Sequence, residues 1–413
     1  MMGMAAYSAY DSYKDSGEGW IEDVPAHWET RKLKQLFQEK KHRPNLALNC
    51  GSISFGEVVE KDDERVPLAT KASYQEVSKG EFLVNPLNLN YDLKSLRIGL
   101  SDIDVVVSAG YLILQAKDEM DKRYFKYLLH RYDVAYMKLL GSGVRQTISF
   151  NHIANSILVA PPLPEQRAIS AFLDDKCAKI DGAVMIKEDQ IGLLRERRQI
   201  IIQDAVTHGL NPAAPMKDSG VDWIGQIPAH WEVKSIRYAF RFRNYQRVPI
   251  SASEREGKQG EYPYYGASGI IDYVQDYIFD EDLILIAEDG ANLLSKSTPL
   301  AFVATGKYWV NNHAHILEPL FPGFKYWAEL LSAADYTVYI SGSAQPKLTR
   351  DRLGSVRVPV PPGDERNAII SFIEQESDKF RNAISIKERQ IAALKEYKTS
   401  LINAAVTGKI KVI

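Results

Sequence analysis

The sequence predicts a mixed α+β fold in which two α/β domains are separated by a long antiparallel two-helix coiled coil, with an internal pseudo-two-fold repeat. Two observations predict this fold. Lys14–Glu29 returns as Lys217–Glu232, and the run 161–207 returns as 361–407. Between these repeated frames lie two inserts with no similarity that we can align, and both contain strand signals bounded by glycine, aspartate and asparagine turns. In each half of the chain, similar repeated segments therefore flank an insert of different sequence.

A chain of 413 residues is too long for one ordinary core, and the repeat divides it after His208. The stretch His208–Pro215 contains glycine and two prolines, which end a helix and do not restart one. The predicted parts are 1–160 as the first α/β domain, 161–210 as the first long helix, 211–358 as the second α/β domain and 359–413 as the second long helix.

Each insert is expected to form a mixed α/β domain with much irregular loop. Asp104–Gln115 in the first insert and Asp282–Ala287 in the second are apolar runs typical of buried strands. A stripe of tyrosine and leucine in Asp121–Leu140 predicts a helix, and Pro322–Leu331 is its expected counterpart.

The residues after each Pro-Pro pair predict a very long helix, which begins at Glu165 or Glu365, where a carboxylate suits the positive end of the helix dipole. Apolar residues recur there in alternating steps of four and three, the seam pattern of a coiled coil. The seam residues are Leu173, Ile180, Val184, Ile191, Leu194 and Ile201 in the first helix and Ile373, Phe380, Ile384, Ile391, Leu394 and Leu401 in the second. About 43 residues at roughly 1.5 Å each give about 64 Å, which exceeds a small domain.

The first helix leads from the first insert to the second, so the second helix can bury its stripe by returning antiparallel along the first. The alternative is that each helix packs on its own domain. Cations interrupt both seams at matching places, namely Lys187 and Arg198 in the first helix and Lys387 and Lys398 in the second. We expect these side chains to reach solvent, pair with a carboxylate or contact a partner.

The overall composition does not indicate a polyanion partner, because the sequence contains 51 basic and 53 acidic residues. The two cysteines, Cys50 and Cys177, have no metal-like spacing and fit a reducing cytoplasm. No apolar run approaches the roughly 20 residues of a membrane span, and Met1–Tyr13 lacks the pattern of a signal peptide. The sequence is therefore expected to be that of a soluble cytoplasmic protein.

The chemistry of a catalytic site is not found in the sequence. Thr305–Tyr308 has a glycine-lysine pair but lacks the rest of a phosphate loop, and no glycine-rich turn suits S-adenosylmethionine. His313 and His315 share a face of an expected strand but have no third ligand, so no metal site is assigned. The repeated His27 and His230 have no acidic or nucleophilic partner nearby in sequence, which favours a packing role beside the repeated tryptophans. No catalytic residue and no cofactor are assigned to this chain.

Signals for nucleic-acid contact are local. Arg241–Arg247 interleaves arginine, aromatic and amide groups, and Tyr262–Gly269 places aromatics on a loop. Gly141–Thr147 and Gly342–Leu348 are equivalent turns whose backbone amides and cation suit phosphate, while glutamine suits a base edge. A solvated strand edge or a structural turn is the alternative at each place. The candidate contact residues are Lys71, Asn88, Asn90, Tyr91, Arg97, Arg145, Gln146, Arg243, Tyr245, Tyr264, Tyr265, Ser268, Asn292, Gln345 and Lys347.

Taken together, the repeated motifs resemble the specificity subunit of type I restriction-modification systems. The likeness rests on the twice-used Trp-Ile-x-x-x-Pro-x-His-Trp, the Gly-Ser turn, the Pro-Pro lead-in and the helix ending Ala-Val-Thr-x-Gly. Tyr265–Ile271, Glu288–Asn292 and Asn311–His315 also look like parts of the family's target-recognition domains. Pro361–Arg366 departs from the usual Leu-x-Glu-Gln form, which weakens that one match. The resemblance covers the chain from about Lys14 onwards.

This resemblance implies a DNA-binding subunit without catalysis of its own, with two target-recognition domains that read an asymmetric, bipartite site in double-stranded DNA. Two modification subunits would bind S-adenosylmethionine and methylate adenine, and ATP-dependent restriction subunits would add DNA cleavage. The helices would then set the unread spacer, and one added turn of about 5.4 Å would change it by under two base pairs at about 3.4 Å each. The base sequence is not readable from these residues, because loop geometry decides which side chains reach the bases.

Two other functions are weighed against this one. A self-sufficient DNA methyltransferase or nuclease would transfer a methyl group or cut DNA without any other subunit. A tandem scaffold that binds only protein would keep the helices but give no sequence-selective DNA protection.

Overall fold

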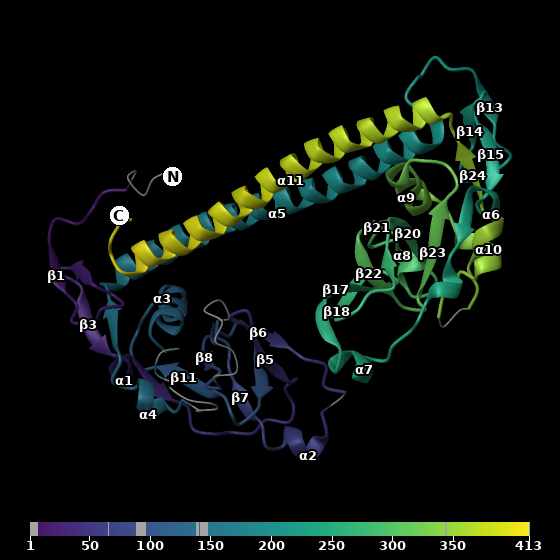
Figure 1. Cartoon of the computed structure of the whole chain (residues 1–413). Coiled ribbons are helices and arrows are strands. Elements are labelled where there is room, and N and C mark those ends of the chain that lie inside the picture. Colours follow the sequence, from purple (N-terminus) through teal and green to yellow (C-terminus); the bar gives the residue numbers. More distant parts are fainter. Residues whose placement is uncertain are drawn as a thin grey trace. The chain divides into compact units, whose positions relative to one another are not determined.

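The structure is a computed structural model that describes residues 7–64, 66–87, 96–137, 140, 148–342 and 345–412. It divides into two compact units (Figure 1). Unit 1 comprises Met1–Lys187 with Arg389–Ile413, and unit 2 comprises Glu188–Glu388. Each unit therefore contains one globular head and one end of each long helix. We call residues 7–162 head 1 and residues 209–362 head 2.

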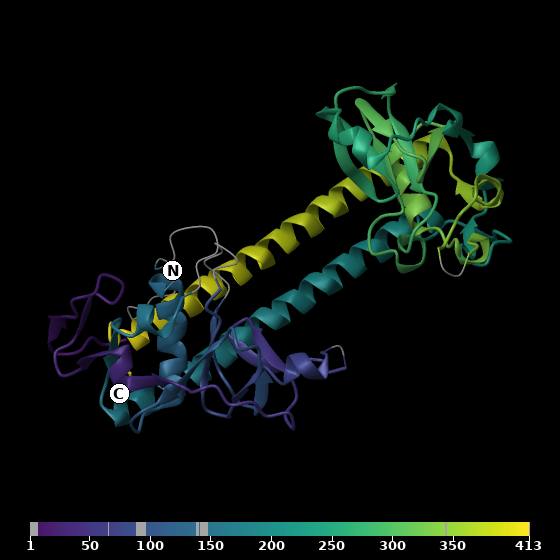
Figure 2. The ribbon, with the colours of Figure 1, turned by 90° about the horizontal axis from the view of Figure 1, so that it is seen from below.

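The two long helices are α5 (Leu163–His208) and α11 (Gly363–Val406), and each runs without a break (Figures 1 and 2). Head 1 contains β1 (Tyr13–Asp15), β2 (Asp23–Pro25), β3 (Glu29–Lys32), α1 (Leu33–Leu36), β4 (Phe37–Glu39), β5 (Gly51–Ser54), β6 (Glu57–Glu60), α2 (Leu68–Lys71), β7 (Gln75–Val77), β8 (Phe82–Val84), β9 (Ile98–Leu100), β10 (Val105–Val107), β11 (Leu112–Ala116), α3 (Lys122–Ala135), α4 (Phe150–Ile153) and β12 (Ile157–Ala160). Head 2 contains β13 (Met216–Asp218), β14 (Gln226–Pro228), β15 (Glu232–Ser235), α6 (Ile236–Ala239), β16 (Phe240–Phe242), η3 (Asn244–Gln246), α7 (Ala252–Glu256), β17 (Gln259–Gly266), β18 (Gly269–Val274), β19 (Phe279–Asp280), β20 (Leu283–Ala287), α8 (Asn292–Ser295), β21 (Ala301–Ala304), β22 (Lys307–Val310), β23 (Ala314–Pro319), α9 (Phe324–Ala333), η4 (Thr337–Tyr339), α10 (Arg350–Ser355) and β24 (Arg357–Val360).

The two heads share one strand topology although their inserts do not align in sequence. Head 1 has the order β4-β11-β8-β9, and head 2 has the order β16-β23-β20-β21. In both heads these neighbours are antiparallel. The hairpin β5–β6 corresponds to β17–β18, and the pair β7·β10 corresponds to β19·β22. The inserts are thus dissimilar in sequence but equivalent in fold, which the sequence did not predict.

The helix that follows this sheet holds the ends of both long helices in each unit. In unit 1 the buried Tyr124 hydroxyl of α3 donates to the carbonyls of Val159 at 3.4 Å and Val406 at 3.1 Å. In unit 2 the buried Tyr326 hydroxyl of α9 donates to the carbonyls of Val206 at 3.1 Å and Pro359 at 3.3 Å. The end of one long helix therefore docks on the head from which the other begins.

Within each unit α5 and α11 pack on each other. In unit 1 Leu173 and Ile180 share a core with Leu401 and Ala404, and in unit 2 Ile202 and Ala205 share a core with Ile369 and Ile373. The antiparallel helix pair and the mixed α/β heads that the sequence predicted are confirmed, and the alternative of two helices packed separately is wrong.

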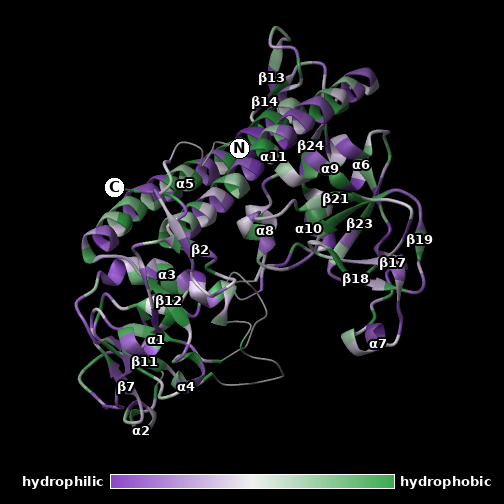
Figure 3. Cartoon of the chain, turned by 90° about the vertical axis from the view of Figure 1, so that its left-hand side faces the viewer, coloured by the Kyte–Doolittle hydropathy of each residue, from purple (hydrophilic) through white to green (hydrophobic). Residues whose placement is uncertain are grey.

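Hydrophobic and hydrophilic residues alternate along both long helices (Figure 3). The predicted seam residues are buried to different extents. The buried ones are Leu173, Ile180, Val184, Ile191, Ile373 and Leu401, and the half-buried ones are Leu194, Ile201, Phe380, Ile384, Ile391 and Leu394. Ile202 is buried more deeply than Ile201 because it packs on head 2. No helix of the described residues is long and apolar enough to cross a membrane.

Three of the seam cations reach polar groups at the edges of the helix pair. In unit 1 Lys187 donates to Gln390 at 2.8 Å, and Lys398 pairs with Asp181 at 2.6 Å. In unit 2 Arg198 donates to Glu329 at 3.1 Å and to Ser377 at 3.2 Å. Lys398 and Arg198 are thus each paired with a carboxylate, whereas Lys187 donates to a neutral amide.

Candidate nucleic-acid interface

The repeated Pro-Ala-His-Trp motif fixes the start of each long helix through a glutamate. In unit 1 His27 Nε2 lies 2.6 Å from Glu165 Oε1, and Trp28 Nε1 donates to Glu165 Oε2 at 2.9 Å. In unit 2 His230 contacts Glu365 Oε1, and Trp231 Nε1 donates to Glu365 Oε2 at 2.8 Å. Each of these histidines thus has an acidic partner that lies more than 130 residues away, where the sequence alone did not reveal it. The contact orients helix and head.

Each head has two loops that are tied together at the same end of the sheet. One follows β8 or β20, and the other precedes α4 or α10. The tie is one backbone hydrogen bond, from Ile148 to the carbonyl of Pro86 at 3.1 Å in head 1 and from Leu348 to the carbonyl of Glu288 at 2.8 Å in head 2. In head 2 Gly290 N also donates to the carbonyl of Pro346 at 3.0 Å. In head 2 the described residues of these two loops therefore lie against each other and form one surface.

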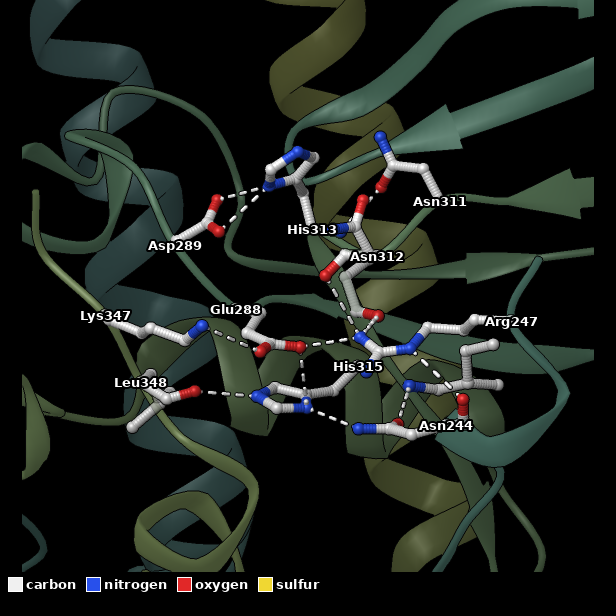
Figure 4. A network of polar contacts seen from close by, with 12 residues as sticks. Asn244, Arg247, Glu288, Asp289, Asn311, Asn312, His313, His315, Lys347 and Leu348 are labelled. Carbon is white, nitrogen blue, oxygen red and sulfur yellow. Dashed lines mark hydrogen bonds and ion pairs between the residues drawn. The ribbon is translucent and has the colours of Figure 1, made fainter. Parts of the chain in front are cut away.

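Arg247 organises this surface in head 2 (Figure 4). One of its terminal nitrogens donates to Glu288 Oε2 at 2.6 Å, to the carbonyl of Asn312 at 3.2 Å and to that of Ala314 at 2.9 Å. A single guanidinium thus holds the loop after β20 against the loop before β23. Lys347 adds a second, longer contact to Glu288 Oε1 at 3.5 Å.

Glu288 is ionised in this setting. Burial alone would raise its pKa, but the hydrogen bond from Arg247 and the charges of Arg247 and Lys347 outweigh burial and hold the pKa below its usual value. A carboxylate that is neutralised from two sides supports the loops and offers little free charge to a ligand.

His315 is a structural residue rather than a metal ligand. It is fully buried, its Nε2 donates to the carbonyl of Leu348 at 2.7 Å, and its Nδ1 accepts from Asn244 Nδ2 at 2.8 Å. Burial, the largest effect, lowers its pKa, so the ring is neutral. The described residues contain no group of three or more possible metal ligands.

His313 differs from His315 because it faces solvent. Its Nδ1 lies 2.9 Å from both carboxylate oxygens of Asp289, and its other ring nitrogen points away from this pair (Figure 4). Lys347, whose backbone pairs with that of Asp289, is exposed on the turn before α10, and so is Gln345 on the same turn. A cation, an amide and an imidazole at one edge suit phosphate and base contacts.

The candidate residues predicted from sequence fall into four groups. Asn88, Asn90, Tyr91, Arg145 and Gln146 lie outside the described residues. Tyr245, Ser268, Gln345 and Lys347 are exposed. Lys71, Arg97 and Arg243 are paired with carboxylates, namely Asp63, Asp133 and the pair Glu281 and Glu318. Tyr264, Tyr265 and Asn292 make contacts within head 2.

Three of these side chains are occupied by contacts within the protein. Tyr264 is buried and shares hydrogen bonds with the backbone of Ile250, so its ring is not open to a base. Arg97 is buried against Asp133, with a distance of 3.0 Å between Nε and Oδ1. Tyr265 packs on Tyr308 with ring centroids 5.6 Å apart.

Arg243 is part of a structural cluster that both heads contain. It donates to Glu281 at 3.0 Å and to Glu318 at 2.9 Å. At the equivalent place in head 1 Lys40 pairs with Glu81 at 2.7 Å, and both cations follow the first strand of the sheet. Because the two heads have unrelated insert sequences but the same fold, we attribute the recurring cation to a structural role in the fold.

The sequence placed Arg247, Asp289 and His313 in candidate stretches but selected none of them as a contact residue, and it weighed a metal-binding role for His313 against a structural or polar contact. The signal for Arg247 was its place at the end of the arginine-rich stretch 241–247, which pointed to Arg243 instead. Asp289 and His313 lie 24 residues apart, and only the sheet register brings them together.

Replacing Arg247 by alanine should destabilise unit 2 by roughly 3–5 kcal/mol, because Glu288 then keeps a buried charge without its main partner. Thermal unfolding followed by circular dichroism measures the loss. The double replacement Arg247→Met with Glu288→Leu should recover most of it, since it removes both charges. Arg241→Ala is the matched control, because that exposed arginine pairs with Glu318 and is worth at most about 1 kcal/mol. Equal effects of Arg247→Ala and Arg241→Ala would contradict the prediction.

Comparison with known proteins indicates the family to which this chain is similar. The family described as type I restriction modification DNA specificity domain matches residues 228–396. A putative type I restriction enzyme specificity subunit of Haemophilus influenzae is 34% identical over 134 residues, which span 32% of this chain and 33% of that protein. A putative type I restriction enzyme specificity subunit of Methanocaldococcus jannaschii is 22% identical over 95% of this chain and 96% of its own.

A solved structure supports the fold over nearly the whole length. It comes from work on complex assembly and conformational transition of a type I restriction-modification system and has a TM-score of 0.65. It is 13% identical and covers 93% of this chain and 98% of that one. At this identity the likeness concerns the fold.

Proposed function

Because this chain belongs to the specificity-subunit family of type I restriction-modification systems, we propose that its two heads read the two halves of an asymmetric, bipartite site in double-stranded DNA. The observation that carries this proposal is the equivalence of the heads. One strand topology recurs in both heads, and an equivalent backbone hydrogen bond joins the residue before α4 or α10 to the segment after β8 or β20. At the place of this hydrogen bond head 1 has Pro86-Leu87 and head 2 has Glu288-Asp289. Different side chains on equal loops suit two different half-sites.

We assign the chemistry to partner subunits. In this proposal two modification subunits bind S-adenosylmethionine and methylate adenine, and ATP-dependent restriction subunits cleave DNA. The complex would work in the cytoplasm, where it meets DNA. The near-equal numbers of basic and acidic residues fit a shared interface, because partner subunits can neutralise phosphates that this chain does not.

A repeated exposed surface supports two copies of one partner. The sequence Ile-Lys-Glu-x-Gln-Ile occurs at 186–191 in α5 and at 386–391 in α11. Ile186 is 57% exposed and Ile386 is 46% exposed, although both are large apolar residues. An identical apolar residue left open on each helix is the feature expected when the same subunit docks twice.

The proposal predicts methylation only when the modification subunits are present. The chain and its modification subunits, mixed with DNA and S-adenosylmethionine, should methylate one bipartite sequence, found by sequencing the methylated sites. Native mass spectrometry should give two modification subunits for each copy of this chain. The chain alone should transfer no methyl group.

The alternatives predict other outcomes in the same experiment. Methyl transfer or cutting by the chain alone would favour a self-sufficient enzyme. Assembly with modification subunits but methylation without sequence preference would favour a protein-only scaffold. Either result would overturn the proposed function.

A further inference from the structure

The backbone around His313 is held from three sides. His313 N donates to Asn311 Oδ1 at 2.8 Å, which fixes a tight turn. Glu288 N donates to the carbonyl of His313 at 2.9 Å, and Arg247 donates to the carbonyl of Asn312 at 3.2 Å. The loop therefore presents the His313 side chain from a fixed position, which lowers the entropy lost when that side chain binds a ligand.

The His313 side chain is itself oriented by Asp289. Its side chain is 47% exposed, whereas that of Asp289 is only 15% exposed. An ionised carboxylate only accepts hydrogen bonds, so Nδ1 of His313 carries the proton of this contact. In the neutral ring Nε2 then has a free lone pair, and it points away from Asp289 (Figure 4).

We propose that His313 reads one base of the half-site bound by head 2, by accepting a hydrogen bond at Nε2 from the exocyclic amino group of adenine or cytosine. This inference rests on the proposed function. In the major groove the adenine N6 and cytosine N4 amino groups are the donors that such an acceptor recognises. Asp289 acts as a positioning residue that sets the tautomer, and the exposed Lys347, whose backbone pairs with that of Asp289, suits a neighbouring phosphate.

Head 1 lacks this side chain. Lys40 N donates to the carbonyl of Ile113, and Arg243 N donates to the carbonyl of Ile316, so Ile113 and Ile316 occupy equivalent strand positions. Counting back three residues from each gives Gly110 in head 1 and His313 in head 2. The effect of changing His313 is therefore confined to one half-site.

The experiment compares variants of the full chain assembled with modification subunits on DNA with randomised half-sites. In His313→Ala, selectivity should fall about 5- to 150-fold at one base position of one half-site, the range found for a lost base contact. The other half-site should stay the same. An A·T pair at that position in the wild-type target identifies adenine as the donor, and a G·C pair identifies cytosine.

Two further variants separate base reading from a structural role. His313→Lys replaces the acceptor by a donor, so preference at that position should change to a base that offers an acceptor to lysine. Asp289→Asn no longer fixes the tautomer and should relax the same position, whereas Asp289→Glu should retain most of the preference. A merely structural pair would lower stability in these variants without altering which base is preferred.

A chemically matched control lies in the same unit. His208 pairs with Asp204 through Nδ1 at 2.8 Å at the end of α5, and it is also exposed. His208→Ala should leave both half-sites unchanged. An unchanged base preference in His313→Ala and in His313→Lys would overturn the inference. If the wild-type complex itself methylates no bipartite site, the proposed function fails instead.

Discussion

Replacing Trp231 by alanine should unfold unit 2 at temperatures at which the wild-type protein is folded. Trp231 is fully buried, and its Nε1 donates to Glu365 at 2.8 Å. Removing a buried tryptophan costs about 3–5 kcal/mol, and Glu365 loses a donor as well. For a unit of this size such a loss lowers the unfolding midpoint by about 6–20 °C. Thermal unfolding followed by circular dichroism or calorimetry measures the shift.

The repeat offers a matched pair for this experiment. Trp28→Ala should have a similar effect on unit 1, because Trp28 is also fully buried and donates to Glu165 at 2.9 Å. Trp231→Phe keeps much of the packing but removes the donor, so it should lower the midpoint by much less. A midpoint for Trp231→Ala within about 2 °C of the wild type would show that the clamp contributes little to the fold.

The repeated parts of the chain could be predicted because their signals are local in sequence. A 4-3 apolar spacing specifies a helix pair whatever the heads contain, and Pro-Pro followed by a carboxylate marks its start. The partner of Glu165 could not be predicted, because His27 and Trp28 approach it from 138 and 137 residues away. Only the docking of head on helix brings these groups together.

The equivalence of the heads was hidden for a different reason. A buried strand needs apolar residues but no particular ones, so Val105–Val107 and Lys307–Val310 occupy equivalent places without a shared pattern. The order of strands is set by long-range pairing, which leaves no mark in local composition. The sequence therefore predicted two α/β domains but not their common topology.

Candidate contact residues were harder still to assign. Composition favoured Arg243 and Tyr264 because arginine and tyrosine suit nucleic acid, yet a salt bridge occupies the first and the core buries the second. His313 lies close to His315 in sequence, and one faces solvent while the other is buried. The turn that Asn311 makes decides which of these two histidines faces solvent. The sequence predicted one strand with both histidines on it, whereas β23 begins at Ala314, after His313.

Adding one heptad to both long helices should lengthen the unread spacer of the DNA target by about three base pairs. α5 and α11 each run from one unit into the other, and their boundary lies at Lys187 and Glu388. Seven residues at roughly 1.5 Å add about 10.5 Å, and DNA rises about 3.4 Å per base pair. A heptad also keeps the seam in phase, so the helices still pair. Sequencing of methylated sites reads the spacer directly, and both half-sites should be unchanged.

Two control insertions show whether helix length is the cause. Seven residues placed in the exposed connection around Asn211, between α5 and β13, lengthen the chain without lengthening a helix and should leave the spacer unaltered. Two residues placed in both helices turn the following seam residues by about 200° and should abolish assembly with the modification subunits, because apolar seam residues would turn towards solvent. A spacer that stays the same after the heptad insertion would mean that the helices do not set the distance between half-sites.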